Sequence, residues 1–215
     1  GKLPTLKVTK TVTNDNGGKK TADMFALKIG SAYVTSGTAN YLPVGKYVVS
    51  EDADLNYIGT IGKDCDTAGN IILDYGDDKE CTIINDDKAP SLILNKIVGI
   101  NNEGTAVKTE WTLTATGPST ISGAGGVISD STFKAGVYEL SESTGPKGYI
   151  ASAWDCKGSS MIDGTHVVVN LGDAVTCTIT NSDEPAHLTL VKTISSNWGG
   201  PTDPTLWTLG ASRGT

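Results

Sequence analysis

Residues 6–12 read LKVTKTV, residues 92–98 read LILNKIV and residues 188–194 read LTLVKTI. Each stretch alternates around one shared lysine, at Lys10, Lys96 and Lys192. Alternation with a period of two is typical of a half-buried β-strand. Because the same stretch occurs three times, the sequence indicates a chain built from copies of one unit.

Other elements recur at matching distances from these lysines. An aromatic residue lies fifteen positions after each of them, at Phe25, Trp111 and Trp207. The stretch GKYVVSE at 45–51 matches GVYELSE at 136–142, and CTIIN at 81–85 matches CTITN at 177–181. The third copy ends before these later elements. We therefore expect two complete units, 1–87 and 88–185, and a truncated third at 186–215 that holds first strands only.

The composition limits the classes of protein. Of 215 residues, 38% are hydrophobic and 19% are charged, which is too apolar and too weakly charged for a disordered chain. No stretch approaches the roughly 20 apolar residues of a membrane span, so we expect no membrane contact in this segment. The net charge of −7 argues against a nucleic-acid partner. The chain opens with Gly1 rather than Met, so we expect a processed or excised piece.

Short β-branched segments bounded by Gly, Pro, Asn and Asp turns recur along the chain, and no window has a helical period. Examples are residues 7–12, 111–116, 137–142, 166–171 and 175–181. Many short strands at regular spacing predict an all-β protein of Ig-like β-sandwich domains. The linkers at 86–90 and 182–186 are short and each contains a proline, which predicts a semi-rigid, head-to-tail arrangement.

Four cysteines divide evenly between the two complete units. No Cys-x-x-Cys pair occurs, and His166 and His187 are not spaced as ligands beside a cysteine, so we expect no metal and no cofactor. Four cysteines allow three pairings, and the repeat favours one disulfide within each unit. The pairs are Cys65–Cys81 and Cys156–Cys177. Disulfides predict an extracellular or cell-surface location, whereas the alternative is four buried thiols in a cytosolic protein.

Three polar residues of each unit share a strand face with apolar neighbours. In unit order they are Lys10, Glu51 and Asn85, then Lys96, Glu142 and Asn181. Two interpretations remain open. One is a buried Lys–Glu salt bridge with Asn as a hydrogen-bonding partner. The other is an isopeptide bond between the Lys amine and the Asn side-chain carbonyl carbon. Burial would favour a neutral amine and a protonated Glu that acts as the catalyst.

The stretch Tyr138-x-Leu140-x-Glu142, followed by Pro146-x-Gly148-Tyr149, resembles the E-box of CnaB-type domains. These are the prealbumin-like (transthyretin-like) repeats of bacterial surface proteins and pilins, and the cysteines resemble those of a disulfide-containing subgroup. The resemblance implies Lys10–Asn85 and Lys96–Asn181 isopeptide bonds with Glu51 and Glu142 as catalysts. Unit one departs from it after Glu51, because the stretch DADLNY lacks the Pro-x-Gly.

We therefore expect a structural segment of an extracellular fibre, pilus or adhesin stalk, whose only chemistry is autocatalytic cross-linking. Its partners would be further repeats or other copies of the same protein. Lys192 has no counterpart of Glu51 or Asn85 in its copy, so the third copy is either cut from a longer array or completed by another chain through strand donation. An alternative is an adhesin domain that binds a glycan or a host protein through residues 119–130. A hydrolase is not expected, because no Ser or Cys elbow lies near either histidine.

Overall fold

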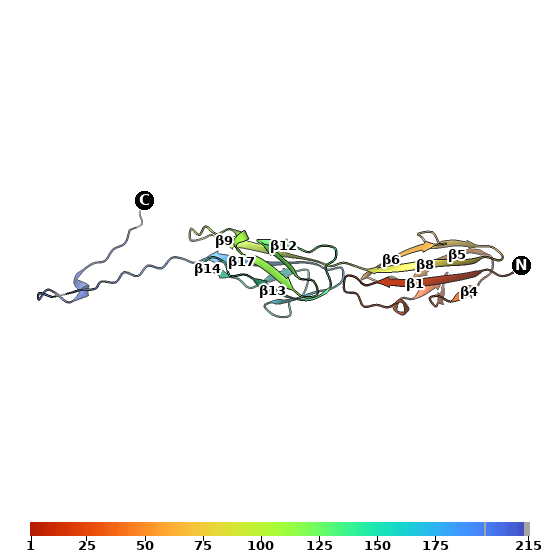
Figure 1. The fold of residues 1–215 in the computed structure, drawn as a ribbon, viewed down its shortest axis with the longest axis horizontal. Coiled ribbons are helices and arrows are strands. Elements are labelled where there is room, and N and C mark those ends of the chain that lie inside the picture. Colours follow the sequence, from red (N-terminus) through yellow and green to blue (C-terminus); the bar gives the residue numbers. More distant parts are fainter. Residues whose placement is uncertain (196, 213–215) are drawn as a thin grey trace.

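The computed structural model describes residues 1–195 and 197–212. Two β-sandwiches lie end to end along the long axis, and the remaining chain trails beyond the second sandwich (Figure 1). We call residues 1–87 unit one, residues 88–185 unit two and residues 186–212 the third segment. No helix in the described part of the chain is long and apolar enough to cross a membrane.

Unit one packs two four-stranded sheets against each other, with strand orders β4-β1-β8-β6 and β3-β2-β5-β7. A 3₁₀ turn, η1 (Ala22–Met24), precedes the buried ring of Phe25. The strands are β1 (Thr5–Thr13), β2 (Leu27–Ile29), β3 (Ala32–Val34), β4 (Ala39–Tyr41), β5 (Gly45–Glu51), β6 (Tyr57–Lys63), β7 (Asn70–Leu73) and β8 (Asp78–Asp87).

Unit two repeats this pairing strand for strand, with orders β12-β9-β17-β14 and β11-β10-β13-β16. Its additional strand β15 also pairs with β17. A 3₁₀ turn, η2 (Lys108–Glu110), precedes the buried ring of Trp111. The strands are β9 (Ser91–Gly99), β10 (Thr112–Thr116), β11 (Ile121–Ala124), β12 (Gly126–Ile128), β13 (Gly136–Glu142), β14 (Tyr149–Ala151), β15 (Asp155–Lys157), β16 (His166–Val169) and β17 (Ala174–Asp183).

The first and last strands of each unit are parallel neighbours. β1 pairs with β8 so that Lys10 faces Ile83, and β9 pairs with β17 so that Lys96 faces Ile179. Period-two alternation turns Leu6, Val8 and Lys10 to the same inner face. A parallel pair cannot be joined by a hairpin, so the rest of each unit forms the connection between its first and last strands.

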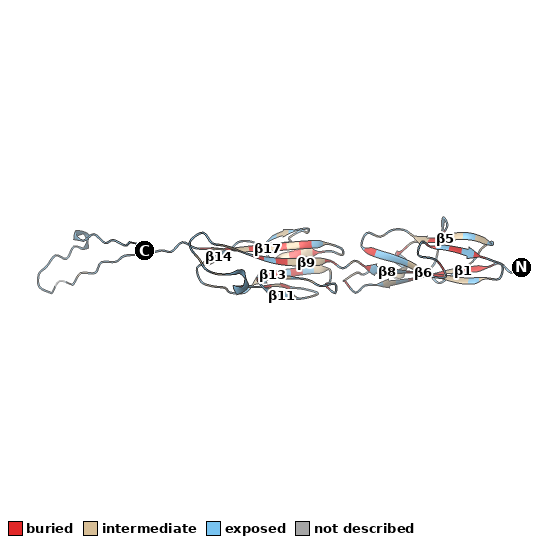
Figure 2. Cartoon of the chain, turned by 90° about the horizontal axis from the view of Figure 1, so that it is seen from above, coloured by how far each residue is buried: buried red, intermediate tan, exposed pale blue. Residues whose placement is uncertain are grey.

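Each unit buries a core of its own, which Figure 2 shows as red strand interiors. The core of unit one consists of Leu6, Val8, Leu27, Ile29, Val49, Cys65, Ile71, Leu73, Cys81 and Ile83. The core of unit two consists of Leu92, Leu94, Leu113, Ala115, Phe133, Tyr138, Leu140, Val167, Val169, Val175, Cys177 and Ile179. Neither core contains residues of the other unit, so each sandwich has a complete hydrophobic core of its own.

The prediction of an all-β protein with β-sandwich units is confirmed. One detail differs: residues 119–130, expected as a loop, contain β11 and β12. β11 pairs with β10 in one sheet, whereas β12 pairs with β9 in the other. This segment therefore crosses from one sheet to the other along the edge of the sandwich. These residues therefore form two short edge strands rather than one continuous loop.

The predicted strand at 188–194 is not formed in this structure. The described residues of the third segment contain a single 3₁₀ turn, η3 (Pro204–Leu206), and no strand. β1 and β9 each lie between two neighbouring strands, whereas residues 188–194 have no strand beside them in the described part of the chain. Alternation alone therefore does not make a strand where no ladder partner is present.

Candidate functional site

Unit one brings its inward polar residues together from three strands. Lys10 lies on β1, and Asn85 lies on the parallel strand β8, directly opposite Val12. Val12 is two positions beyond Lys10, so Lys10 and Asn85 are diagonal neighbours on one face. Glu51 ends β5 in the facing sheet. The sandwich thus places the lysine and asparagine on one layer and the carboxylate opposite them.

The Lys10 ammonium is held in a closed environment. Its side chain is 0% exposed, and Nζ lies 2.5 Å from Glu51 Oε2. Nζ also lies 4.5 Å from the centre of the Phe25 ring, which covers it. Burial lowers the pKa of Lys10 below its ordinary value, while the hydrogen bond and charge of Glu51 act in the opposite direction. The net lowering increases the fraction of neutral amine, which is the nucleophilic form.

Unit two repeats the arrangement with one further hydrogen bond. Lys96 Nζ lies 2.9 Å from Glu142 Oε2 and 4.8 Å from the centre of the Trp111 ring. Asn181 Nδ2 donates to Glu142 Oε1 at 2.9 Å. Lys96 and Asn181 are both buried. A single carboxylate therefore contacts both the amine and the amide in unit two.

The two asparagine side-chain oxygens lack a donor. Asn85 Oδ1 and Asn181 Oδ1 are the buried side-chain polar atoms of the described residues that have no hydrogen-bond partner. Leaving a buried acceptor unsatisfied costs about 1–3 kcal/mol. In unit two the neighbouring carboxylate accepts from Nδ2 of the Asn181 amide and so gives Oδ1 no donor. Each unit therefore holds a buried amide whose carbonyl oxygen is not hydrogen-bonded.

Sequence reasoning missed Gly59, which completes the site of unit one. Gly59 lies on β6 directly opposite Asn85. A Cβ at this position would lie 2.5 Å from Glu51 Oε1 and 2.8 Å from Asn85 Oδ1. The glycine therefore makes room for the carboxylate and the amide to approach each other. The role of Gly59 follows only from its cross-strand register with Asn85. The repeat gives no signal for it, because Ala151 occupies the corresponding position opposite Asn181 in unit two.

Both predicted disulfides are present. Cys65 bonds Cys81 and Cys156 bonds Cys177, and the described residues include no free cysteine. Cys81 and Cys177 lie on the last strand of their units, two residues before Ile83 and Ile179. In unit two the disulfide joins directly opposed residues of β15 and β17. The disulfide of unit one therefore fixes the turn after β6 to the strand that carries Asn85, and the disulfide of unit two fixes β15 to the strand that carries Asn181.

The third segment keeps part of the pattern. Lys192 Nζ lies 5.0 Å from the centre of the Trp207 ring, and η3 precedes this ring as η1 precedes Phe25 and η2 precedes Trp111. Apolar side chains of this segment are exposed. They include Leu188, Val191, Trp198 and Leu206. The lysine–aromatic pair is thus present without the sandwich that surrounds it in the two units.

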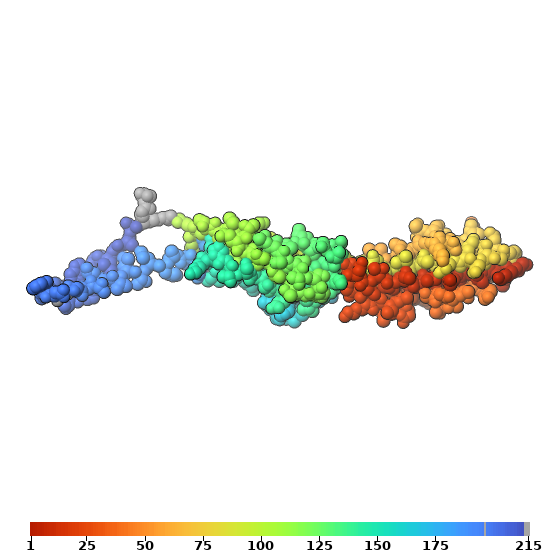
Figure 3. Space-filling view, viewed as in Figure 1, coloured from red at the N-terminus to blue at the C-terminus, as the bar shows by residue number. Residues whose placement is uncertain are grey.

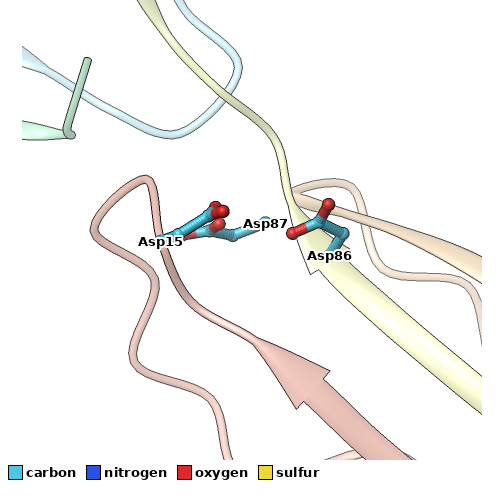
Figure 4. Close-up of side chains that lie close together, drawn as sticks. All are labelled: Asp15, Asp86 and Asp87. Atoms are coloured by element: carbon cyan, nitrogen blue, oxygen red, sulfur yellow. The ribbon is translucent and has the colours of Figure 1, made fainter. Parts of the chain in front are cut away.

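Three carboxylates gather beside the junction of the units, at Asp15, Asp86 and Asp87 (Figure 4). The carboxylate of Asp87 is buried and accepts hydrogen bonds from the backbone N–H groups of Asn16 and Gly18. Partial desolvation and the nearby charges of Asp86 and Asp87 raise the pKa of Asp15. We interpret this cluster as part of the loop that Asp87 holds, and we assign no metal to it.

Of the two histidines, His166 begins β16 and His187 lies near the start of the third segment. His166 Nδ1 lies 2.9 Å from Asp163 Oδ2 at the surface. The backbone N–H groups of Thr165 and His166 hold the pKa of Asp163 well below its ordinary value, together with the His166 side chain. This pairing supports a turn, in which Thr165 Oγ1 also lies 3.2 Å from His166 Nδ1.

The fold and the buried residues define a class: β-sandwich domains with parallel terminal strands, an inward Lys–Glu–Asn group and a disulfide. A sequence model of the prealbumin-like fold domain matches residues 87–179 and 183–215, more than half of the chain. The chain therefore belongs to the family of prealbumin-like fold domains. A search of the curated proteins finds no significant match.

Comparison with solved structures finds similar chains at low sequence identity. The Bacillus anthracis TIE protein is 16% identical with a TM-score of 0.50, and the match covers 85% of this chain and 34% of that one. A C-terminal fragment of the pilus adhesin SpaC from Lactobacillus rhamnosus GG is 16% identical with a TM-score of 0.44, covering 88% and 100%. The major pilin T3.2 of Streptococcus pyogenes is 14% identical with a TM-score of 0.43, covering 86% and 99%. The chain thus spans about a third of the TIE protein.

Proposed function

We propose that this chain is a load-bearing segment of an extracellular, cell-surface fibre such as a pilus or adhesin stalk. The observation that carries the proposal is the pair of buried Lys–Glu–Asn groups at equivalent positions of two end-to-end sandwiches. Membership of the prealbumin-like family and one disulfide in each unit support it. The protein would not be an enzyme with turnover, since its chemistry would end in its own cross-links.

The proposed reaction joins Lys10 to Asn85 and Lys96 to Asn181. The neutral amine Nζ attacks the side-chain carbonyl carbon Cγ of asparagine, while the protonated Glu donates a hydrogen bond to Oδ1. The glutamate then carries a proton from the attacking nitrogen to the leaving nitrogen. The new Nζ–Cγ bond forms, the Cγ–Nδ2 bond breaks, and ammonia departs. The two sandwich layers hold the reacting groups together, so no activated substrate is needed.

The position of the bonds explains why they would suit a fibre. They would connect the first strand of each unit to the last, which are the strands through which a pulling force enters and leaves. The covalent path would run from Lys10 directly to Asn85 and then through the linker into unit two. Residues 11–84 would then lie outside the loaded path, and tension would not open their hydrogen-bonded ladders.

Force spectroscopy on the full chain tests this function. Stretching an unlinked unit would release about 200 Å of chain between its lysine and asparagine, after allowance for the disulfide loop. We expect no such release from the natural chain in either unit. The matched control is the double variant E51Q/E142Q, in which both units should unfold and extend. Extension of the natural chain equal to that of the variant would contradict a load-bearing role.

We further propose that the third segment begins another unit of the same kind. Its lysine–aromatic contact and the match of the family to residues 183–215 support this interpretation. Its partners would be further repeats in the same protein or a strand supplied by another copy. Size-exclusion chromatography at several concentrations separates these two cases. Concentration-dependent assembly through residues 188–212 would favour strand donation, and a constant monomer would favour a further repeat.

A further inference from the structure

The junction between the units is closed by a loop that sequence analysis did not single out. We call residues 14–18 the clasp loop of unit one. The side chain of Asn16 donates from Nδ2 to the backbone oxygens of Ser131 and Phe133 in unit two, each at 2.9 Å. The backbone N–H of Ala135 donates to Asn16 O at 2.8 Å. Asn16 is buried at this contact, and Figure 3 shows the two bodies abutting there.

Two residues of unit one fix the conformation of the clasp loop through hydrogen bonds. Asp87, at the end of β8, accepts hydrogen bonds from the backbone N–H groups of Asn16 and Gly18. Tyr57, opposite Asp87 on β6, donates from its hydroxyl to Asn14 Oδ1 at 2.7 Å. A Cβ at Gly18 would lie 2.4 Å from the Tyr57 hydroxyl and 2.7 Å from Asp87 Oδ2. The loop is therefore fixed by its own unit.

Unit two has the same support at its far end, although no complete sandwich follows it here. Residues 100–104 form its clasp loop, and Asp183 accepts hydrogen bonds from the backbone of Asn101, Asn102 and Gly104 at 2.7–2.8 Å. Tyr149 lies opposite Asp183 on β14. A Cβ at Gly104 would lie 2.2 Å from the Tyr149 hydroxyl and 2.9 Å from Asp183 Oδ2. This frame repeats the carboxylate contacts that hold Asn16, but not the tyrosine–asparagine hydrogen bond, because Ile100 stands where unit one has Asn14.

The linkers that follow the two units also begin with equivalent backbone hydrogen bonds. The backbone N–H of Lys88 donates to Asn56 O, and that of Glu184 donates to Gly148 O, at equivalent positions before Tyr57 and Tyr149. Five positions separate Asp87 from Leu92, and five separate Asp183 from Leu188. A sandwich beginning at Leu188 would therefore start at the same distance from the clasp loop as unit two does. Asn102, the counterpart of Asn16, is exposed and donates to Asp183 O.

We propose that the clasp loop of unit two is a preformed docking site for the next prealbumin-like unit. Asn102 would release Asp183 O and donate to the backbone carbonyls of the loop that corresponds to residues 131–135. The inference rests on the proposed succession of units, and it requires no isopeptide bond. Its partner is a complete unit that continues from Leu188, because the same contact already joins unit one to unit two.

The two clasp loops differ at three positions, and Gly17 is the one of these whose substitution would press directly on unit two. Gly17 in the first clasp loop adopts φ of +99°, and a Cβ there would lie 3.0 Å from both the backbone N and O of Ala135. Glu103 occupies this position in the second loop, with φ of +66°. A Cβ at this site requires the docked backbone to move by a few tenths of an ångström. The second junction is therefore expected to pack less closely than the first.

A chain with three complete units tests the proposal, since each unit has its own core. Residues 1–187 would be followed by a second copy of residues 92–187. Hydrogen–deuterium exchange then reports on the two amides that correspond to Ala135. We expect N102A to accelerate exchange of the amide in the third unit about fivefold, and N16A to do the same for Ala135 itself. Each variant is the control for the other junction.

The replacement E103G supplies the opposite change. It should slow exchange of the third-unit amide, because the docked backbone can approach as closely as it does at Gly17. Intact mass of the same samples reports separately on the cross-links. If N102A leaves exchange in the third unit unchanged while N16A accelerates exchange at Ala135, the second clasp loop is not a docking site.

Discussion

Lys10 and Lys96 are charged residues placed where the strand pattern requires apolar ones. Such burial is costly unless the charge is paired or removed. Each lysine has a glutamate within hydrogen-bonding distance and an aromatic ring over its amine. The pKa of Lys10 is lowered by burial, which is the direction that favours reaction with Asn85. The same contacts would stabilise the folded unit before any bond forms.

The role of the glutamates is tested by replacing each in turn. E51Q keeps the shape of the side chain but cannot transfer a proton. We expect the bond of unit one to be absent, so that this variant retains one ammonia, about 17 Da, relative to the natural chain. E142Q should do the same in unit two, and each variant leaves the other bond intact. Intact mass followed by peptide mapping locates the change; full cross-linking of E51Q would contradict a catalytic role.

Gly59 gives a second prediction at this scale. G59A places a methyl group against Glu51 Oε1 and Asn85 Oδ1, so we expect unit one to lose about 1–3 kcal/mol of unfolding free energy. The matched control is A151G, at the corresponding position of unit two, which should cost only about 0.5–1 kcal/mol through added backbone freedom. Chemical denaturation followed unit by unit measures both. A neutral G59A would show that the close approach is not required.

Period-two alternation was sufficient to predict the six inward polar residues. This prediction needs only the assignment of residues to the two faces of a strand, which follows directly from their spacing in the sequence. Gly59 and Asn16 were not predictable in this way. Gly59 matters because of the residue opposite it on β8, and Asn16 because of a loop 115 positions away in the next unit. Neither neighbour can be found from local pattern.

Among the elements, the β1–β8 ladder carries an ion-pair network that unit two lacks. Glu80 on β8 faces Lys7 and contacts Lys63 and Thr9, whereas Thr176 occupies its position on β17. The hydrogen bond from Lys63 is the main cause that lowers the pKa of Glu80 from 4.5 to about 2, and Thr9 adds to it. The network is exposed, so its effect is modest and sensitive to salt.

This network predicts a pH dependence confined to unit one. The pKa of Glu80 is lower in the folded state than in the unfolded state. At pH values between these two pKa values, the folded state therefore binds fewer protons. The stabilisation from Glu80 is therefore present above pH 4.5 and is lost as the pH falls toward 2. Thermal unfolding of the natural chain and of E80Q across this range measures it. Unit one of E80Q should show the smaller loss; equal losses would contradict the assignment.

The disulfides give a prediction at the same scale. They close loops of 16 and 21 residues, for which chain-entropy models give about 3 kcal/mol each. C65A/C81A should therefore destabilise unit one, and C156A/C177A unit two, by this amount. Each pair is the control for the other, and calorimetry resolves the two units. Destabilisation of both units by either pair would indicate that the sandwiches unfold together.

Strand positions followed well from β-branched runs bounded by turn residues, but two segments did not. Residues 119–130 contain β11 and β12, which are short, contain glycine and lack a strong apolar run. Residues 188–194 have the pattern of β1 and β9 but form no strand in the described structure. Both cases show that pairing partners, which are distant in sequence, decide whether a short segment becomes a strand.

At the scale of the whole molecule, two complete cores and a short linker produce an elongated shape (Figure 1). The recurrence of sequence elements predicts two complete units followed by the start of a third. It did not predict how firmly they are joined, which depends on the Asn16 contacts. N16A should increase bending between the units without changing the stability of either. Small-angle scattering would show a smaller average maximum dimension, and an unchanged profile would contradict a rigid junction.

Intact mass spectrometry of the natural chain tests the proposed cross-links most directly. Two disulfides remove four hydrogens from the sequence mass, and two isopeptide bonds remove two ammonia molecules, about 34 Da more. We predict this full loss, with cross-linked peptides that join Lys10 to Asn85 and Lys96 to Asn181. A mass that shows the loss of four hydrogens and nothing further would contradict the cross-links and leave the two buried groups as salt bridges.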